Sequence, residues 1–187
     1  MLDVIHLTRT FGQLTAVDDV TFTVPAGQMI GFVGGNGAGK TTTMRMIMGL
    51  LAPDSGQVNL NGRPITRSDR SRFGYMPEER GLYAKQPILS QLIYLAELKG
   101  MTRDSAAAEA SGLMARFGLG DRLKDKLEKL SLGNQQRVQI AAAVMADPIG
   151  LILDEPFSGL DPKAVDEMAG LLAERASRGV PVLFSSH

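Results

Sequence analysis

A glycine-rich segment, GGNGAGKTT at residues 34–42, matches the pattern G-x-x-x-x-G-K-[ST]. Glycines let successive backbone N–H groups surround phosphate oxygens, and a helix that begins at the loop presents its positive end to them. In such a loop Lys40 reaches the β- and γ-phosphates, and the Thr41 hydroxyl can bind Mg²⁺. A tight turn from strand to helix is the alternative, but a turn does not require the lysine. The segment therefore predicts a nucleotide phosphate site. Its residues are Gly34, Gly35, Asn36, Gly37, Ala38, Gly39, Lys40, Thr41 and Thr42.

Two acids, Asp154 and Glu155, follow the apolar run in LILDEP. Such a run is typical of a parallel strand that is buried on both faces. A carboxylate at its end can hold Mg²⁺ through water, and the next one can act as general base toward an attacking water. Taken alone, the two acids have as their alternative a strand end before a proline turn, with both side chains simply solvated. The phosphate loop upstream favours the catalytic interpretation.

The segment LSLGNQQR, residues 130–137, places a serine and a glycine at the start of a predicted helix. Ser131 or Asn134 could simply cap the first turn, and taken alone this interpretation is favoured. A helix N-terminus with a serine hydroxyl and a glycine amide can also bind phosphate. Because the first site already has its loop, a second phosphate site indicates that two copies of the chain meet.

The elements that position these residues follow from the hydrophobic pattern. Alternating apolar residues in LDVIHL and VTFTV predict strands, and MIGFVG predicts the strand before the glycine-rich loop. After the loop, KTTTMRMIMGLL predicts a helix with a buried stripe of Met44, Ile47, Met48 and Leu51 that ends before Pro53. From Pro87 to Ala146 the pattern is helical, and strand, helix and strand then follow over IGLILDE, residues 161–179 and VPVLFSS.

Composition limits the function classes. The 187 residues are 44% hydrophobic, carry no cysteine, and have 20 basic and 20 acidic side chains. A net charge of zero provides no overall field to attract nucleic acid, and thiolate chemistry is excluded. The start, MLDVIHLTRTFG, lacks the features of a signal peptide, and no run of about 18 apolar residues could span a membrane.

Five segments, GGNGAGKTT, LSLGNQQR, LILDEP, FSGLD and SSH, occur in this order. They resemble the Walker A, signature, Walker B, D-loop and H-loop motifs of ABC-type ATPase cassettes, and the resemblance runs from TRTFG to His187. It implies an α/β fold: a P-loop NTPase (RecA-like) core with an N-terminal antiparallel β subdomain and an inserted α-helical subdomain. We expect one domain over residues 1–187. Residues 1–80 and 147–187 would form the β subdomain and the ATP-binding core, and residues 81–146 the helical subdomain.

The resemblance also implies roles for single residues in a head-to-tail dimer that encloses ATP. The catalytic residues would be Glu155, His187 and Lys40, and the metal ligands Thr41, Glu78 and Asp154. Phe11 would stack on adenine with Val17 beside it, and Thr42 would contact the phosphates. Ser131, Gly133 and Asn134 would act on the nucleotide of the other copy, with Asp161 bridging the two sites.

The sequence departs from the family pattern at a few positions. Gly35 replaces a common proline, and Leu132 and Asn134 replace the usual glycine and glutamine of the signature. In FGYMPEERGLY, Glu78 stands where most cassettes have a glutamine, and this stretch is similar to bacterial export-type cassettes. A carboxylate can ligate Mg²⁺ but adds negative charge beside the γ-phosphate. Glu79 and Arg80 are expected to form a local pair or to contact the membrane partner.

These observations predict the ATP-binding and ATP-hydrolysing subunit of an ABC transporter of export type. ATP and Mg²⁺ are the expected ligands, and a membrane-spanning permease and a second cassette the expected partners. The expected location is cytoplasmic, peripheral on the inner face of the cell membrane. The resemblance further implies C-terminal truncation, because the family core continues past the H-loop.

Two other classes of protein share part of this pattern: a soluble ABC-type ATPase and an ordinary P-loop kinase or GTPase. A soluble ABC-type ATPase acting on DNA would need a long coiled coil before the signature, and no heptad run precedes it. A version acting on the ribosome would usually carry two cassettes and basic linkers. An ordinary P-loop kinase or GTPase would leave LSLGNQQR and SSH unexplained.

Overall fold

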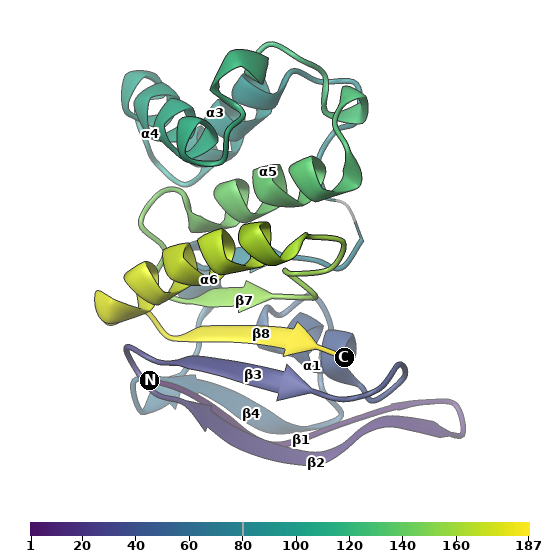
Figure 1. The fold of residues 1–187 in the computed structure, drawn as a ribbon. Helices are drawn as coiled ribbons and strands as arrows, with labels where there is room; N and C mark the ends of the chain where they lie inside the picture. Colours follow the sequence, from purple (N-terminus) through teal and green to yellow (C-terminus); the bar gives the residue numbers. More distant parts are fainter. Residues whose placement is uncertain (80) are drawn as a thin grey trace.

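The computed structural model describes residues 1–79 and 81–187 and contains two β-sheets beneath a helical layer (Figure 1). Helices flank a parallel sheet, and an antiparallel sheet lies at the N-terminal end of the chain. This arrangement confirms the predicted fold class. The predicted pairing of Arg80 with Glu79 lies outside the described residues.

The antiparallel sheet has the order β2-β1-β4-β5 and forms from the segments with alternating apolar residues. Its strands are β1 (Leu2–Phe11), β2 (Leu14–Val24), β4 (Ser55–Leu60) and β5 (Arg63–Pro64). Leu2, Val4 and Leu7 turn their side chains into the core. The pairing of β1 with β2 shifts register between Val4 and Leu7 and again on either side of Arg9. These shifts change which face a given residue occupies along the hairpin.

The parallel sheet has the order β3-β8-β7-β6. Its strands are β3 (Met29–Val33), β6 (Gly74–Met76), β7 (Leu151–Leu153) and β8 (Val182–Ser186). β8 is central, since it pairs with β3 on one side and β7 on the other. All four strands run in the same direction, so their carboxyl ends meet at one edge.

Helices α1 (Lys40–Ile47), α2 (Arg67–Ser71) and α6 (Pro162–Ser177) connect these strands. The prediction for α1 was partly wrong. The helix ends at Ile47, and Gly49 with a φ of 69° turns the chain away, so Leu51 lies beyond the helix. Met44 and Ile47 are fully buried as expected, and Met46 is buried as well.

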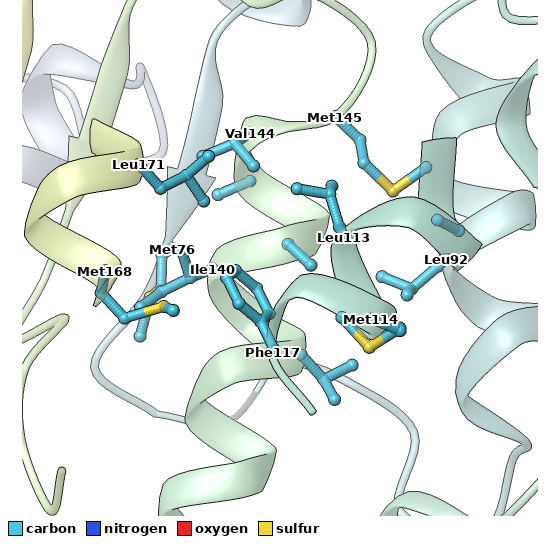
Figure 2. Packing of buried hydrophobic residues seen from close by; sticks show 14 of the residues in the cluster. Met76, Leu92, Leu113, Met114, Phe117, Ile140, Val144, Met145, Met168 and Leu171 are labelled. Carbon is cyan, nitrogen blue, oxygen red and sulfur yellow. The ribbon is translucent and has the colours of Figure 1, made fainter. Parts of the chain in front are cut away.

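The helical layer consists of α3 (Ile88–Leu98), α4 (Arg103–Arg116), two 3₁₀ turns, η1 (Gly120–Arg122) and η2 (Leu127–Lys129), and α5 (Leu132–Val144). α5 lies between the α3–α4 pair and the parallel sheet (Figure 1). Figure 2 shows Phe117 and Met114 packing toward Ile140 of α5, with Met76 and Leu171 beyond it. One hydrophobic cluster thus joins the helical layer to the sheet and fixes α5 against it.

Candidate nucleotide-binding and catalytic site

The carboxyl ends of the four parallel strands deliver the predicted functional residues to one place. β3 leads into the glycine-rich loop, β6 is followed by Glu78, β7 by Asp154 and Glu155, and β8 by His187. With the N-terminus of α1 they border a cavity of about 760 Å³. The cavity is lined by Phe11, Leu14, Ala16, Asn36, Gly37, Ala38, Gly39, Lys40, Thr41, Thr42, Glu78, Leu132, Gln136, Asp154, Glu155, Ser158, Gly159 and His187.

The glycine-rich loop is shaped by the backbone of Gly39, which caps the N-terminus of α1 with a φ of 79°. A side chain at this position would collide with the carbonyl oxygen of Ala16 and crowd Val17. Gly39 is therefore needed both for the left-handed conformation and for the close approach of β2. The end of β8 fixes the start of the loop, because the Gly34 N–H donates to the Ser186 carbonyl at 3.2 Å.

Lys40 lies inside the loop that precedes it. Its Nζ donates to the carbonyl oxygens of Gly34 at 2.6 Å and Gly35 at 3.2 Å, and the residue is 8% exposed. The Glu155 Oε1 atom is 3.8 Å from the same Nζ. A buried ammonium held by loop carbonyls, beside a helix N-terminus, is arranged to receive phosphate oxygens.

The two acids after β7 are tied together by a buried serine that sequence reasoning missed. The Ser185 hydroxyl donates to Asp154 Oδ1 at 2.6 Å and accepts the Glu155 N–H at 2.7 Å. Glu155 has a φ of 51°, a conformation that costs free energy for a residue with a side chain. Ser185 therefore holds both acids in position and stabilises the bend between them.

The Glu155 carboxylate faces the imidazole at the end of β8. Glu155 Oε2 lies 2.9 Å from His187 Nδ1. The Glu155 side chain is largely buried, and that of His187 is exposed. A carboxylate beside both an ammonium and an imidazole can accept a proton from a water molecule that these groups help to place.

The residues present fit a divalent cation. Asp154 is buried, and its Oδ2 atom has no hydrogen-bond partner within the protein. Thr41 Oγ1 donates to Glu78 Oε2 at 3.3 Å, which brings two further oxygen ligands into the same cavity. The described residues contain no cluster of three acidic, histidine or cysteine side chains. Mg²⁺ commonly takes one or two carboxylates, with phosphates and water as its other ligands, so these oxygens suit it.

Tyr75 of β6 is partly buried and lies near enough to Asp154 to sense its charge. Burial raises the pKa of Tyr75, and the negative charge of Asp154 raises it further. Each of the two effects disfavours a phenolate near a carboxylate. Tyr75 therefore stays protonated throughout the physiological pH range and contributes no charge to the site.

The part of the cavity lined by the β1–β2 hairpin is apolar. Its residues are Phe11, Leu14 and Ala16, and Phe11 is 47% exposed. Val17 was predicted beside Phe11 as a nucleotide contact, but it is 3% exposed, packs in the core against Gly39 and does not line the cavity. Ala16 is the residue at this place.

The signature and D-loop residues line a second cavity of about 350 Å³ that shares Leu132 and Gly159 with the first. Ser131 caps α5, since its hydroxyl accepts the Asn134 N–H at 3.4 Å. Asp161 caps α6 by accepting the Ala164 N–H at 3.0 Å. Gly133 also lines this cavity. Four of the predicted residues thus gather beside the first cavity rather than inside it.

Gln136 is a second residue that sequence reasoning missed. Its Nε2 donates to the carbonyl oxygens of Glu155 at 2.9 Å and Pro156 at 3.1 Å. These bonds join α5 to the bend that carries Glu155. The only hint in the sequence is a polar residue within the first turns of an otherwise buried helix.

Known proteins resemble this chain in sequence and in structure. Residues 17–158 match the family described as ABC transporter. The uncharacterized ABC transporter ATP-binding protein YhaQ of Bacillus subtilis (strain 168) is 48% identical over 187 residues, which are 100% of this chain and 63% of that protein. The lipopolysaccharide export system ATP-binding protein LptB of Haemophilus influenzae is 33% identical over 190 residues. This match includes 97% of this chain and 78% of that protein.

A solved structure described as the ATP binding subunit of an ABC transporter superposes with a TM-score of 0.89 at 33% identity. The match covers 100% of this chain and 79% of the solved one. The chain spans about three fifths of the length of the Bacillus subtilis relative, as the 63% coverage shows. No described helix is long and apolar enough to cross a membrane.

Proposed function

The chain belongs to the ABC transporter family as an ATP-binding domain, and from this premise we propose that it binds ATP in the 760 Å³ cavity and hydrolyses it to drive transport. The observation that carries the proposal is the meeting of Lys40, Asp154 and Glu155 at one edge of the parallel sheet. An ammonium for phosphates, a buried unpartnered carboxylate oxygen and a second carboxylate free to take a proton are the groups that phosphoryl transfer to water requires.

In the proposed reaction a water molecule attacks the γ-phosphorus. Glu155 accepts a proton from this water as the new P–O bond forms and the bond to the β-phosphate oxygen breaks, which yields ADP and inorganic phosphate. Lys40 stabilises the charge on the β- and γ-phosphate oxygens, and Thr42 contacts them from the first turn of α1. His187, 2.9 Å from Glu155, orients the carboxylate and the attacking water.

Thr41, Asp154 and Glu78 would hold Mg²⁺, which neutralises phosphate charge when bound. The unpartnered Oδ2 of Asp154 and the contact between Thr41 and Glu78 support this assignment. Glu78 contributes an oxygen as the more common glutamine would, with an additional negative charge.

We infer that the second cavity acts on the nucleotide bound to a second cassette. The second cavity shares Leu132 and Gly159 with the first, and the four predicted residues line the second but not the first. They are Ser131, Gly133, Asn134 and Asp161. A head-to-tail arrangement of two chains would bring them to the opposite face of an ATP molecule. The partner can be a second copy or a paralogue.

The proposed membrane partner is a permease that contacts the helical layer from the inner face of the membrane. A groove of about 290 Å³ between the end of β6, α3 and α5 is lined by Pro77, Leu82, Leu95 and Lys99 among others, and it is the candidate contact. Burial lowers the pKa of Lys99 in this groove. We propose residues 81–146 as the helical subdomain, since α3, α4 and α5 lie within it, and this subdomain would form the groove together with the end of β6.

Export is the proposed direction of transport. The stretch PEERGLY is similar to export-type cassettes, and the named export function of the Haemophilus influenzae relative supports this choice.

The experiment is the substitution Glu155→Gln, assayed for ATP binding and for phosphate release. The amide cannot take the proton, so we expect the rate of hydrolysis to fall by about 10²–10⁴-fold while ATP affinity is retained. Glu128→Gln, an exposed glutamate in η2, is the matched control and should leave both unchanged. Undiminished phosphate release by Glu155→Gln would contradict the role of Glu155 as base.

A further inference from the structure

The end of the β1–β2 hairpin carries an aromatic ring with a guanidinium on one face. Phe11 pairs with Leu14 across the turn, and both line the apolar end of the first cavity. The Cζ atom of Arg9, two residues earlier on β1, lies 4.9 Å from the centre of the Phe11 ring. Arg9 does not line the cavity. The guanidinium thus lies over one face of the ring without lining the cavity, and the ring itself is 47% exposed and lines it.

Arg9 is held in this place by Asp54, which lies in the loop before β4. Arg9 Nη1 donates to Asp54 Oδ1 at 2.6 Å, and the Thr10 N–H donates to Asp54 Oδ2 at 2.7 Å. The Asp54 N–H in turn donates to the Thr8 carbonyl at 2.9 Å. Both carboxylate oxygens are used, and the Arg9 side chain is only 26% exposed. The guanidinium is thus anchored behind the ring rather than free to reach the phosphate end of the cavity.

We propose that Arg9, anchored by Asp54, is a positioning residue that fixes the Phe11 ring for stacking against the adenine of ATP. The inference rests on the proposed function, since it takes ATP as the ligand and Phe11 as the contact of its base. A cation on one face of an aromatic ring is attracted by the π electrons and restrains the ring. A half-exposed ring that is restrained before binding loses less rotational freedom when a base stacks on it.

The test compares ATP with inorganic tripolyphosphate, which has the phosphates and no base. Affinities of both are measured by titration calorimetry in the presence of Mg²⁺ for the parent chain, Phe11→Ala, Arg9→Met and the double variant. We expect Phe11→Ala to weaken ATP about tenfold, within the range for lost base stacking. Arg9→Met should weaken ATP about two- to fivefold, and neither substitution should change tripolyphosphate affinity.

The double variant isolates the route by which Arg9 acts. If Arg9 works through the ring, Arg9→Met should cause no further loss of ATP affinity once Phe11 is alanine. Arg103→Met is the matched control, because Arg103 also pairs with an acid but lies on α4. Asp54→Asn is a second variant that releases Arg9 without removing it. It should lower ATP affinity and leave tripolyphosphate affinity unchanged, as Arg9→Met does. Asp54→Asn therefore still tests the proposal if Arg9→Met lowers the melting temperature.

Each other outcome overturns a defined part of the proposal. If Arg9→Met weakens ATP and tripolyphosphate equally, Arg9 attracts phosphates and does not position the ring. If Phe11→Ala weakens ATP while Arg9→Met and Asp54→Asn have no effect, the inference is wrong and the proposed function stands. If the parent chain binds neither ligand, the proposed function itself fails.

Discussion

The two cavities that meet at Leu132 differ in the groups that they offer to a phosphate. The larger one contains the Lys40 ammonium at the start of α1, together with carboxylates and an imidazole that follow the ends of parallel strands. In the smaller one, hydroxyl and carboxylate side chains cap helices, and its arginine, Arg137, is bonded to the Phe117 carbonyl. These groups fit the proposal that the first cavity carries out the reaction and that the second completes a ligand bound elsewhere.

This difference also appears in how each cavity is constructed. Asp154 and Glu155 of the larger cavity are held by Ser185, which lies in the sheet itself and is 1% exposed. The groups of the smaller cavity depend on the N-termini of α5 and α6, which lie at the surface. Substitutions in the first should therefore change what a single chain does with ATP. Substitutions in the second should change only what a pair of chains does.

The largest effect is expected from Lys40→Ala. Removing the ammonium deletes charge-assisted hydrogen bonds to phosphate, each of about 1.5–3 kcal/mol, so ATP affinity should fall about a hundredfold or more. Equilibrium titration with ATP measures it. Lys163→Ala on α6 is the control and should leave affinity unchanged. Unaltered ATP binding by Lys40→Ala would contradict the proposal that the larger cavity, and not the smaller one, binds the phosphates of ATP in a single chain.

An intermediate effect is expected from Ser185→Ala. Asp154 loses a donor and the Glu155 N–H is left without its acceptor, so we expect kcat to fall about tenfold with little change in KM. Ser185→Thr keeps a hydroxyl and should recover part of the rate. Ser186→Ala, at the partly buried neighbouring residue whose hydroxyl bonds neither acid, should have no effect. A fall in melting temperature without any change in kcat would reduce Ser185 to a structural role.

The smallest effect on a single chain is expected from Ser131→Ala. The substitution removes the cap of α5, which should lower the free energy of unfolding by about 1 kcal/mol. ATP affinity of the chain in dilute solution should not change, because Ser131 does not line the first cavity. Chemical denaturation and titration with ATP measure the two quantities. Loss of ATP affinity comparable to that of Lys40→Ala would show that Ser131 acts within its own chain.

The sequence predicted well what depends on local spacing. The glycine-rich loop is continuous in the sequence, and its pattern predicted the helix that begins at Lys40. Buried runs predicted β7 and β8, and parallel strands bring their ends together. The fold class and the family were therefore predicted correctly from five short segments. The roles of the single site residues remain predictions.

What depends on distant partners was not predicted. Ser185 and Gln136 act through bonds to Asp154, Glu155 and Pro156, which are far from them in the chain, and a serine in a strand or a glutamine in a helix has no pattern of its own. Val17 was placed beside Phe11 by the resemblance alone, which does not show that its side chain is buried and outside the cavity lining.

Two signals in the sequence were available but not used. Thr66 and Asp69 form a capping box at α2, a helix of five residues that hydrophobic periodicity cannot reveal. Arg63 and Thr66 hold the pKa of Asp69 well below its usual range, and this keeps the cap charged. Gly49, two residues after Ile47, marks the true end of α1, which the apolar stripe extended too far.

The most direct test of the account mixes two inactive variants. Glu155→Gln lacks the base of the first cavity, and Ser131→Arg blocks the second. In a head-to-tail pair with one chain of each kind, one composite site combines the intact Glu155 of one chain with the intact Ser131 of the other. The account predicts little phosphate release from either variant alone and a clear return of activity when they are mixed. If the mixture stays as inactive as its components, the two cavities act within one chain and the central claim is wrong.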